Sequence, residues 1–380
     1  MQSVYSKDFK LGVLGGGQLG RMLIQDAISL DVKVYCLDPS PEAPCSDISN
    51  GFVIGDFNDY QSVLNFGKDK DVVTIEIEHV NVDALKELEK RGVKVFPQSE
   101  VIEVVQDKGK QKLFYKEHGV PTSDFILVDN AEQLKAKLGA DKKVQKLRRG
   151  GYDGRGVQIV DGSLKELEVF DQPSVLEDLV DIEKELAIIV ARNERGEVKS
   201  YPVVDMEFSA EANLVEFLYS PAEISPSIEE KARKISENLI EKLEMVGILA
   251  VELFLTKTGE ILVNEVAPRP HNSGHHTIEA NITSQYAQHL RAILGLPLGS
   301  TKVIKPAVMV NLLGSEGYKG KVVYDGLEKI MSIPEVYVHI YGKADTKPYR
   351  KMGHVTILGD GMKELKQQAR EIKNELVVKS

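Results

Sequence analysis

The sequence predicts an α/β protein that begins with a doubly wound parallel sheet and continues into a second α/β domain and a small carboxy-terminal domain. In the first ~100 residues, short apolar strands alternate with helical patterns, as in a parallel sheet covered by helices. After the Gly119-Val120-Pro121 break the strands become shorter and a glycine-rich segment follows. The length of 380 residues suits two or three domains. We expect them at residues 1–105, 106–295 and 296–380.

Composition excludes several classes of protein. The net charge is −10 and no long Lys/Arg block occurs, which argues against a nucleic-acid surface but allows a small anionic substrate in a local basic pocket. The sequence has neither a signal-peptide pattern nor a run of eighteen apolar residues, so we expect a cytoplasmic protein with no membrane partner. Cys36 and Cys45 show no disulfide or metal-ligand pattern, and we treat both as incidental.

Residues 10–38 predict a strand, a glycine loop, a helix and a second strand. Gly15, Gly17 and Gly20 fit G-x-G-x-x-G, and Asp38 closes the second strand. One interpretation is a dinucleotide site, with the helix amides on a pyrophosphate and Asp38 on a ribose. The alternative is an ordinary tight turn, because such turns in doubly wound sheets favour glycine.

Further strands are expected at Gly51–Ile54, Asp71–Glu76 and Val93–Phe96. Glu76 and Glu78 end the apolar strand DVVTIEIE, at the sheet edge where this class of fold binds ligands. We therefore expect one of the two glutamates to contact substrate.

A helix is predicted from about Glu100 to His118, and it carries Lys108, Lys110 and Lys112. The next segment, residues 143–160, predicts a hairpin in which Lys146 ends a strand before a glycine-rich tip. Such a tip offers many backbone N–H groups, as a polyphosphate cover requires, although it lacks the G-K-[ST] ending of a P-loop. An ordinary exposed hairpin tip would not explain the surrounding cations, which are Lys146, Arg148, Arg149 and Arg155.

The residues from Glu177 to Val180 follow an apolar strand and lead to another strand at Glu185–Ala191. Strand-edge backbone here could contact an adenine, and Glu185 could contact ribose hydroxyls. A solvated acidic loop is an equally good interpretation of the local pattern.

Residues 248–276 predict two apolar strands joined by a two-residue turn at Thr258-Gly259, followed by a polar loop. This register places Glu252 opposite Glu265, with β-carbons roughly 5 Å apart, where two carboxylates repel unless a cation lies between them. Mg²⁺ suits such a pair because it takes one or two carboxylates and fills its other positions with water and substrate phosphates. A register shifted by one residue would turn one glutamate to solvent. The loop that follows favours a site, because polar side chains crowd into it: Asn264, Arg269, His271, Asn272, His275 and His276.

The carboxy-terminal region is expected to contain strands near Ala307–Leu313, Glu335–Tyr341 and Gly353–Leu358 and a helix from Met362. Between the last two strands lies the most cationic loop of the chain, with Lys343, Lys347, Arg350 and Lys351.

These parts occur in the order of the ATP-grasp superfamily, and the resemblance extends over nearly the whole chain. GGGQLGRM, GYDGRG, NEVAPRPHNSGH, GLPLG, VNLLG and YRKMGH resemble the 5-(carboxyamino)imidazole ribonucleotide synthetases of purine biosynthesis. The resemblance implies an ATP-grasp fold with an amino-terminal substrate-binding domain. It also implies a carbon–nitrogen ligase, usually a homodimer, that uses ATP, Mg²⁺ and bicarbonate to carboxylate 5-aminoimidazole ribonucleotide.

The resemblance also assigns residues. It implies ATP contacts from Lys108, Lys146, Gly151, Tyr152, Asp153, Gly154, Arg155, Gly156, Val157, Glu177, Asp178, Leu179, Val180, Glu185, Asn264 and Glu265. It implies Mg²⁺ ligands at Glu252 and Glu265. It implies substrate contacts from Gln18, Leu19, Glu76, Asn272, Lys343, Arg350 and Lys351, so that the glycine loop needs no NAD. Catalytic roles fall to Arg269, His271, Arg155 and Tyr152. One departure is Met206-Glu207-Phe208, where the family often has Asn-x-His at the nucleotide site.

The implied chemistry fits these residue types. Attack of bicarbonate on the γ-phosphate gives carboxyphosphate, and phosphoryl transfer needs positioning and cations, which lysines, a metal and a closing lid supply. Arg269 would hold bicarbonate or carboxyphosphate, and His271 would move a proton as the amine attacks, or would only pack the loop. The alternatives are a formate-dependent glycinamide ribonucleotide transformylase, an NAD(P)-dependent oxidoreductase and a non-catalytic nucleotide-binding protein.

Overall fold

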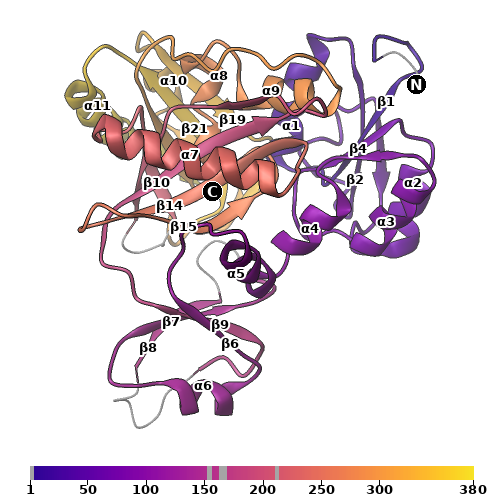
Figure 1. Cartoon of the computed structure of the whole chain (residues 1–380). Helices are drawn as coiled ribbons and strands as arrows, with labels where there is room; N and C mark the ends of the chain where they lie inside the picture. Colours follow the sequence, from indigo (N-terminus) through magenta and orange to yellow (C-terminus); the bar gives the residue numbers. More distant parts are fainter. Residues whose placement is uncertain (1–3, 152–155, 162–168, 210–213) are drawn as a thin grey trace.

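The computed structural model describes residues 4–151, 156–161, 169–209 and 214–380 (Figure 1). Its first part is the parallel sheet that the sequence predicts, in the order β3-β2-β1-β4-β5 with every neighbouring pair parallel. The strands are β1 (Lys10–Leu14), β2 (Lys33–Asp38), β3 (Gly51–Ile54), β4 (Val72–Ile75) and β5 (Lys94–Val95). The helices are α1 (Gln18–Ile28), α2 (Tyr60–Gly67) and α3 (Val82–Lys90).

The single helix expected from Glu100 to His118 is wrong, because two helices replace it. They are α4 (Ser99–Val105) and α5 (Lys108–Glu117). Gln106 ends the first, and Asp107 caps the second, since its carboxylate accepts hydrogen bonds from the N–H groups of Gly109 and Lys110. The break places Lys108 at the first position of α5.

A small lobe follows, drawn at the bottom of Figure 1. Its described residues form a four-stranded antiparallel sheet in the order β6-β9-β7-β8 and the helix α6. Its elements are β6 (Phe125–Val128), α6 (Ala131–Lys137), β7 (Lys143–Leu147), β8 (Val157–Val160) and β9 (Ser174–Asp178). The predicted hairpin over residues 143–160 is confirmed by the β7–β8 pairing.

The large sheet runs β15-β14-β10-β12-β13-β16-β21-β19, with β11 paired to β10. Its first strands are β10 (Ile182–Arg192), β11 (Val198–Ser200), β12 (Val204–Phe208), β13 (Val215–Ser220), β14 (Gly247–Thr256) and β15 (Ile261–Ala267). The carboxy-terminal region adds β16 (Ala307–Leu313), β19 (Val336–Ile340) and β21 (Lys351–Leu358) to the same sheet. The hydrogen-bonded array therefore crosses the boundary that we expected at residue 296.

The remaining elements cover this sheet or connect its strands. The helices are α7 (Pro226–Lys242), η1 (Asn272–Gly274), α8 (Thr277–Ala280), α9 (Gln285–Ile293), α10 (Leu327–Met331) and α11 (Met362–Glu375). Two short pairs complete the fold, β17 (Gly320–Lys321) with β20 (Asp345–Thr346), and β18 (Val323–Asp325) with β22 (Val377–Lys379). No helix of the described residues is both long enough and apolar enough to span a bilayer.

The β14–β15 hairpin confirms the facing pair but not the predicted turn. Glu252 lies opposite Glu265, whereas Leu255 pairs with Ile261, one residue earlier than a two-residue turn would give. The turn is longer, because the N–H of Thr256 donates to the Glu260 carbonyl. The register shifts back by one residue between Glu252 and Leu253, where Asn264 is the extra residue of a bulge. Bulges re-aim side chains, and this one restores the opposition of the two glutamates.

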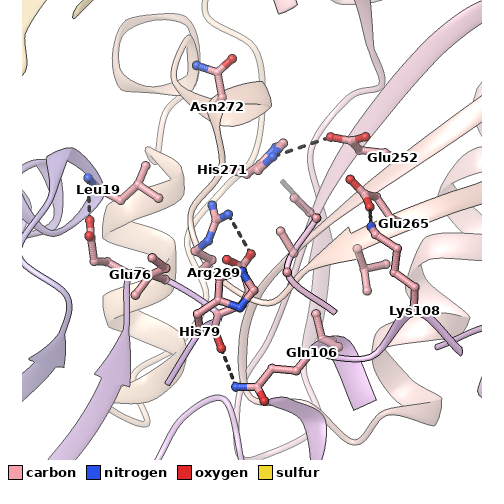
Figure 2. Close-up of a pocket in the computed structure, with 18 of the residues that line it drawn as sticks. Leu19, Glu76, His79, Gln106, Lys108, Glu252, Glu265, Arg269, His271 and Asn272 are labelled. Carbon is pink, nitrogen blue, oxygen red and sulfur yellow. Dashed lines mark hydrogen bonds and ion pairs between the residues drawn. The ribbon is translucent and has the colours of Figure 1, made fainter. Parts of the chain in front are cut away.

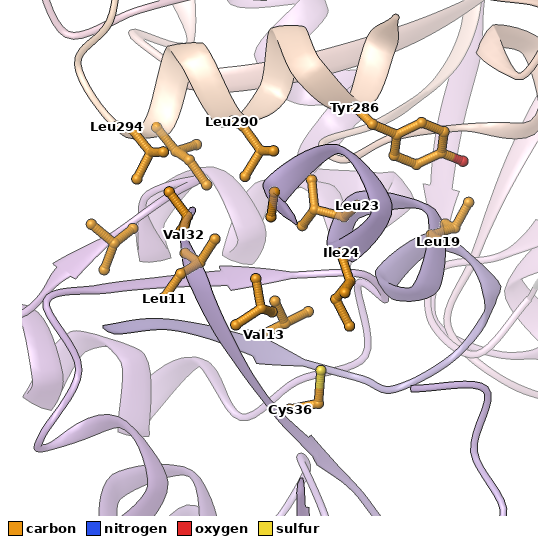
Figure 3. Packing of buried hydrophobic residues seen from close by; sticks show 14 of the residues in the cluster. Leu11, Val13, Leu19, Leu23, Ile24, Val32, Cys36, Tyr286, Leu290 and Leu294 are labelled. Atoms are coloured by element: carbon orange, nitrogen blue, oxygen red, sulfur yellow. The ribbon is translucent and has the colours of Figure 1, made fainter. Parts of the chain in front are cut away.

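An apolar cluster joins the first domain to the rest of the chain. Figure 3 shows Leu23 and Ile24 of α1 between the parallel sheet and α9, where Leu290 and, just after the helix, Leu294 join the cluster. Tyr286, also on α9, is fully buried in the same cluster. This packing fixes the amino-terminal glycine loop relative to the loop after β15.

Candidate active site

A cavity of about 670 Å³ lies where the first domain, the small lobe and the large sheet meet (Figure 2). Of the predicted site residues, it is lined by Gln18, Leu19, Glu76, Lys108, Gly151, Glu252, Glu265, Arg269, His271, Asn272 and Lys351. It is not lined by Lys146, Gly156, Val157, Glu177, Asp178, Leu179, Val180, Glu185, Asn264, Lys343 or Arg350. Tyr152, Asp153, Gly154 and Arg155 lie outside the described residues.

The glycine loop binds an anion that belongs to the protein itself. The Glu76 carboxylate accepts hydrogen bonds from the N–H groups of Gly17 at 2.8 Å, Leu19 at 3.1 Å and Gly20 at 3.0 Å. A β-carbon on Gly17 would lie 2.6 Å from Glu76 Oε1, so glycine is needed for this approach. Asp38 accepts from the N–H of Gly16. The groups that the dinucleotide interpretation assigned to NAD are thus engaged within the protein, which argues against that interpretation.

Burial raises the pKa of Glu76, although the N–H groups of Gly20 and Gly17 and the charge of Arg269 act in the opposite direction. A carboxylate at the N-terminus of a helix is favoured by the helix dipole. Glu76 also lines the cavity. Its role as a substrate contact stays a prediction.

The two facing glutamates of the hairpin reach the cavity from adjacent strands (Figure 2). Lys108 forms an ion pair with Glu265, and Nε2 of His271 lies 3.7 Å from Oε1 of Glu252. Burial raises the pKa of Glu252 despite the nearby Lys108 and Lys351. Burial also lowers the pKa of Lys108 to about 8, and Lys146 adds to this effect.

The carboxylates of Glu252 and Glu265 fit Mg²⁺ in the way that proteins bind this ion beside substrate phosphates. Two opposed, partly exposed carboxylates supply hard oxygen ligands, and the substrate would supply the rest. Among the described residues no cluster of three or more His, Cys, Asp or Glu side chains has the arrangement of a metal site. An all-protein cage is therefore not expected.

Lys146 points from β7 toward the hairpin. Its Nζ donates to Asn264 Oδ1 at 2.7 Å and lies 3.2 Å from Glu177 Oε2. The bulge thus brings Asn264, the second polar side chain of β15 beside Glu265, toward the small lobe. The site residues Lys146, Glu177 and Asn264 are neighbours, although they lie beside the cavity and not on its wall.

Arg269 forms an ion pair that crosses between domains. Its Nη2 lies 2.7 Å from Oε1 of Glu78, and its Nη1 donates to the carbonyl of Pro270. Its Nε atom is buried and has no hydrogen-bond partner among the described residues.

The sequence left open which of Glu76 and Glu78 would contact substrate. The structure places both on the cavity wall.

His271 is half-buried. The loss of solvent around its ring, with Arg269 and Lys351 nearby, lowers its pKa well below the usual value. The imidazole is therefore neutral at pH 7. Its Nδ1 accepts a hydrogen bond from the N–H of Ser273, so Nε2 carries the hydrogen. From this state His271 takes up a proton only at Nδ1.

The residues of the carboxy-terminal cationic loop do not all reach the cavity. Lys351 lines the cavity. Lys343 donates to the Lys351 carbonyl at 2.7 Å, and Arg350 donates to the Asp345 carbonyl at 2.7 Å. The loop thus brings one of its three predicted substrate contacts to the cavity wall.

The expected adenine strand also divides. Glu177 turns inward, whereas Asp178 and Val180 line a separate hollow of about 360 Å³, and Leu179 is exposed. Burial raises the pKa of Glu185 to about 7, and the neighbouring Glu252 adds to this effect.

Sequence reasoning missed two charged groups that hold the site together. Arg148 binds Asp107 with Nε and Nη2, both at 2.8 Å, which fixes the start of α5 against the end of β7. Lys112 was noted only as a helix residue, yet it is buried beside Glu177. The Asp-Lys-Gly sequence that begins α5 was a capping signal that could have revealed the helix break.

Family models match three consecutive parts of the chain. A ribonucleotide synthetase preATP-grasp domain matches residues 9–106, an ATP-grasp domain residues 113–286, and a phosphoribosylaminoimidazole carboxylase C-terminal domain residues 307–368. An N5-carboxyaminoimidazole ribonucleotide synthetase from Thermotoga maritima has a crystal structure with 44% identity and a TM-score of 0.90, covering 98% of this chain and 99% of that one. The chain belongs to the N5-carboxyaminoimidazole ribonucleotide synthetase family.

Two further relatives differ from this chain in length or have a structure with bound ligands. The chloroplastic phosphoribosylaminoimidazole carboxylase of Vigna aconitifolia is 41% identical over 367 residues, which cover 93% of this chain but 65% of that protein. The chain therefore spans about two thirds of that relative's length. The N5-carboxyaminoimidazole synthase of Aspergillus clavatus has a structure with ADP and 5-aminoimidazole ribonucleotide, at 32% identity and a TM-score of 0.85, covering 97% of this chain and 98% of that one.

Proposed function

We propose that this protein uses ATP and bicarbonate to carboxylate the exocyclic amine of 5-aminoimidazole ribonucleotide in purine biosynthesis. The observation that carries the proposal is the single cavity in which the glycine-loop residues, Lys108, the facing glutamates and the Arg269–His271 loop meet. The relatives' names and the ADP and ribonucleotide complex of the Aspergillus protein support it.

The chain's own residues would divide the work. Lys108 and Lys146 would bind the ATP phosphates, and Arg269 would exchange Glu78 for bicarbonate as its partner. A bicarbonate oxygen attacks the γ-phosphorus, ADP leaves, and the carboxyphosphate so formed reacts with the amine, releasing phosphate and one proton. Positioning and charge neutralisation account for most of the acceleration of phosphoryl transfer. His271 begins neutral, as a proton acceptor must, and would move this proton as the amine attacks.

Glu252 and Glu265 would hold Mg²⁺, which supplies charge neutralisation at the phosphates when it is bound, and the neighbouring Asn264 would contact ATP. Lys351, Lys343 and Arg350 would bind the phosphate of the ribonucleotide, because Arg forms paired hydrogen bonds to phosphate and Lys acts as a point charge. Gln18, Leu19, Glu76 and Asn272 would contact the rest of this substrate. We also propose that the protein is a cytoplasmic homodimer, and light scattering would test the dimer. We propose domain boundaries after residues 105 and 295, which limited proteolysis would test.

The decisive assay measures phosphate release from ATP with each candidate ribonucleotide, with and without bicarbonate. We expect release to require 5-aminoimidazole ribonucleotide and bicarbonate together. Release that instead requires glycinamide ribonucleotide and formate would support the transformylase alternative and refute the proposal.

The metal hairpin offers a matched pair of variants. Glu265→Gln should nearly abolish phosphate release, since it removes a carboxylate from the phosphate-bridging site. Glu260→Gln, at the exposed tip of the same hairpin, should retain it. Normal turnover in Glu265→Gln would refute the assignment of this site.

A further inference from the structure

Lys112 is a buried lysine one helical turn after Lys108 on α5. Its side chain is 3% exposed. The Nζ atom donates to Thr122 Oγ1 at 2.6 Å and to Ser123 Oγ at 3.0 Å. The same atom lies 3.1 Å from Oε2 of Glu177. Residues four apart on a helix share a face. On this face of α5, Lys108 contacts Glu265 of the hairpin, and Lys112 contacts Glu177 of β9.

One oxygen of Glu177 connects two lysines. Oε2 lies 3.1 Å from Lys112 Nζ and 3.2 Å from Lys146 Nζ, and it accepts from Ser123 Oγ at 2.7 Å. Lys146 then donates to Asn264 at the bulge of β15. A buried polar chain therefore leads from α5 through β9 and β7 to the metal hairpin.

The chain also bridges the two lobes of the nucleotide site. Thr122, which accepts from Lys112, donates its own hydroxyl to the Val263 carbonyl at 2.7 Å. The N–H of Val263 in turn donates to the Pro121 carbonyl. Lys112 thus lies where the small lobe joins the large sheet.

A buried ammonium group is a costly way to obtain stability alone. Burial lowers the pKa of Lys112 to about 8, although Glu177 acts in the opposite direction. An apolar side chain of similar length would avoid the desolvation that this shift reflects. The three polar contacts instead hold Glu177 in one position.

We propose that Lys112 is a positioning residue for ATP, which shares the Glu177 carboxylate with Lys146 and so leaves Lys146 available to the phosphates. This inference rests on the proposed role of Lys146 in ATP binding. Without Lys112, the buried Glu177 carboxylate keeps Lys146 as its one lysine partner among the residues that the structure describes. The Glu177–Lys146 pair then competes more strongly with ATP for the same ammonium group, because Coulomb attraction is strong in a buried site.

The test compares Lys112→Met with Lys110→Met. Lys110 lies on the same helix but pairs with Glu103 at the surface, so its replacement controls for the loss of a lysine from α5. We expect Lys112→Met to raise the KM for ATP and the Kd for ADP at least tenfold, to leave kcat within threefold, and to leave the KM for the ribonucleotide unchanged. Lys110→Met should match the wild type in all four values.

A double-mutant cycle with Lys146→Met separates positioning from a general structural effect. If Lys112 acts through Lys146, then adding Lys112→Met to Lys146→Met should not raise the KM for ATP further. Multiplying effects, or a KM for ATP within twofold of wild type in Lys112→Met, would overturn the inference. A Lys146→Met variant with normal KM for ATP would instead refute the proposed role of Lys146.

Ser123→Ala provides a milder second variant, because it removes a hydroxyl that contacts both Lys112 and Glu177. Ser123→Ala is the variant to use if Lys112→Met does not fold. In the otherwise wild-type protein, we expect Ser123→Ala to raise the KM for ATP about threefold. In the Lys146→Met variant, adding Ser123→Ala should leave the KM for ATP unchanged. Equal effects in the two backgrounds would overturn the inference.

Discussion

The Glu76→Gln variant tests how the glycine loop is held. Three backbone N–H groups bind the carboxylate, with Gly17 on Oε1 and Leu19 and Gly20 on Oε2. Glutamine keeps one acceptor oxygen and presents an NH₂ group in place of the other. At least one N–H at the start of α1 then loses its acceptor, because an NH₂ group cannot accept it.

The magnitude follows from two opposed effects. A buried N–H left without an acceptor costs about 1–3 kcal/mol, and the lost charge at the helix N-terminus adds roughly 0.3–1 kcal/mol. Burial raises the pKa of Glu76, so a neutral side chain recovers part of the desolvation. We expect a net destabilisation of about 1–3 kcal/mol, which lowers Tm by a few degrees.

Thermal unfolding and amide exchange read out this change at two levels. In Glu76→Gln the peptide that contains the Gly17, Leu19 and Gly20 amides should exchange faster, while peptides from the large sheet should not change. Glu42→Gln, an exposed glutamate of the same domain, serves as the control. An unchanged Tm with unchanged exchange at the loop would refute the view that Glu76 holds it.

Three further predictions concern substrate, cofactor and pH. Arg350→Ala should raise the KM for 5-aminoimidazole ribonucleotide at least tenfold, a loss of about 1.4 kcal/mol, with the KM for ATP unchanged; steady-state kinetics would contradict this if ATP alone were affected. ADP with Mg²⁺ should raise Tm and NAD should not, whereas a clear shift with NAD would return the glycine loop to dinucleotide binding. Burial lowers the pKa of His289 to about 3, so between pH 6.5 and 3 the unfolded chain binds a proton that the native chain does not, and the free energy of unfolding falls on acidification by up to about 1.4 kcal/mol per pH unit. Urea unfolding at pH 7, 6 and 5 should show a shallower fall in His289→Gln, and equal slopes would contradict the assignment.

Local patterns predicted most of the elements and the central pair of glutamates. The strands β3 and β16 have the predicted bounds, and Glu252 faces Glu265 as expected. The facing pair was nevertheless reached through a turn one residue too short, and the bulge at Asn264 compensates. The side chain at this bulge, Asn264, contacts Lys146 on another strand. The periodicity of a single strand carries no information about such a partner.

Contacts between distant segments decided the other features that the sequence did not reveal. Glu76 and the glycine loop are almost sixty residues apart, so a fingerprint within the loop could not show that its amides were already bound. The local Asp-Lys-Gly signal marks the break before Lys108, but the contact that holds Asp107 there comes from Arg148 in another lobe. A charged helix such as α5 reads as solvated unless its tertiary neighbours are known, and Lys112 is the residue for which this difference matters most.

The continuity of the large sheet limits how this protein can be divided. The β13–β16 pairing joins the ATP-grasp strands to the carboxy-terminal strands, so a chain cut between them would expose a long unpaired strand edge, which invites association with other chains. Chimeras that exchange the carboxy-terminal region between relatives must therefore match the β13 edge, strand register included. The β14–β15 hairpin and the strands that flank the cationic loop lie toward opposite ends of this one sheet. Exchange of side chains at the cavity wall therefore disturbs the fold less than exchange of whole segments.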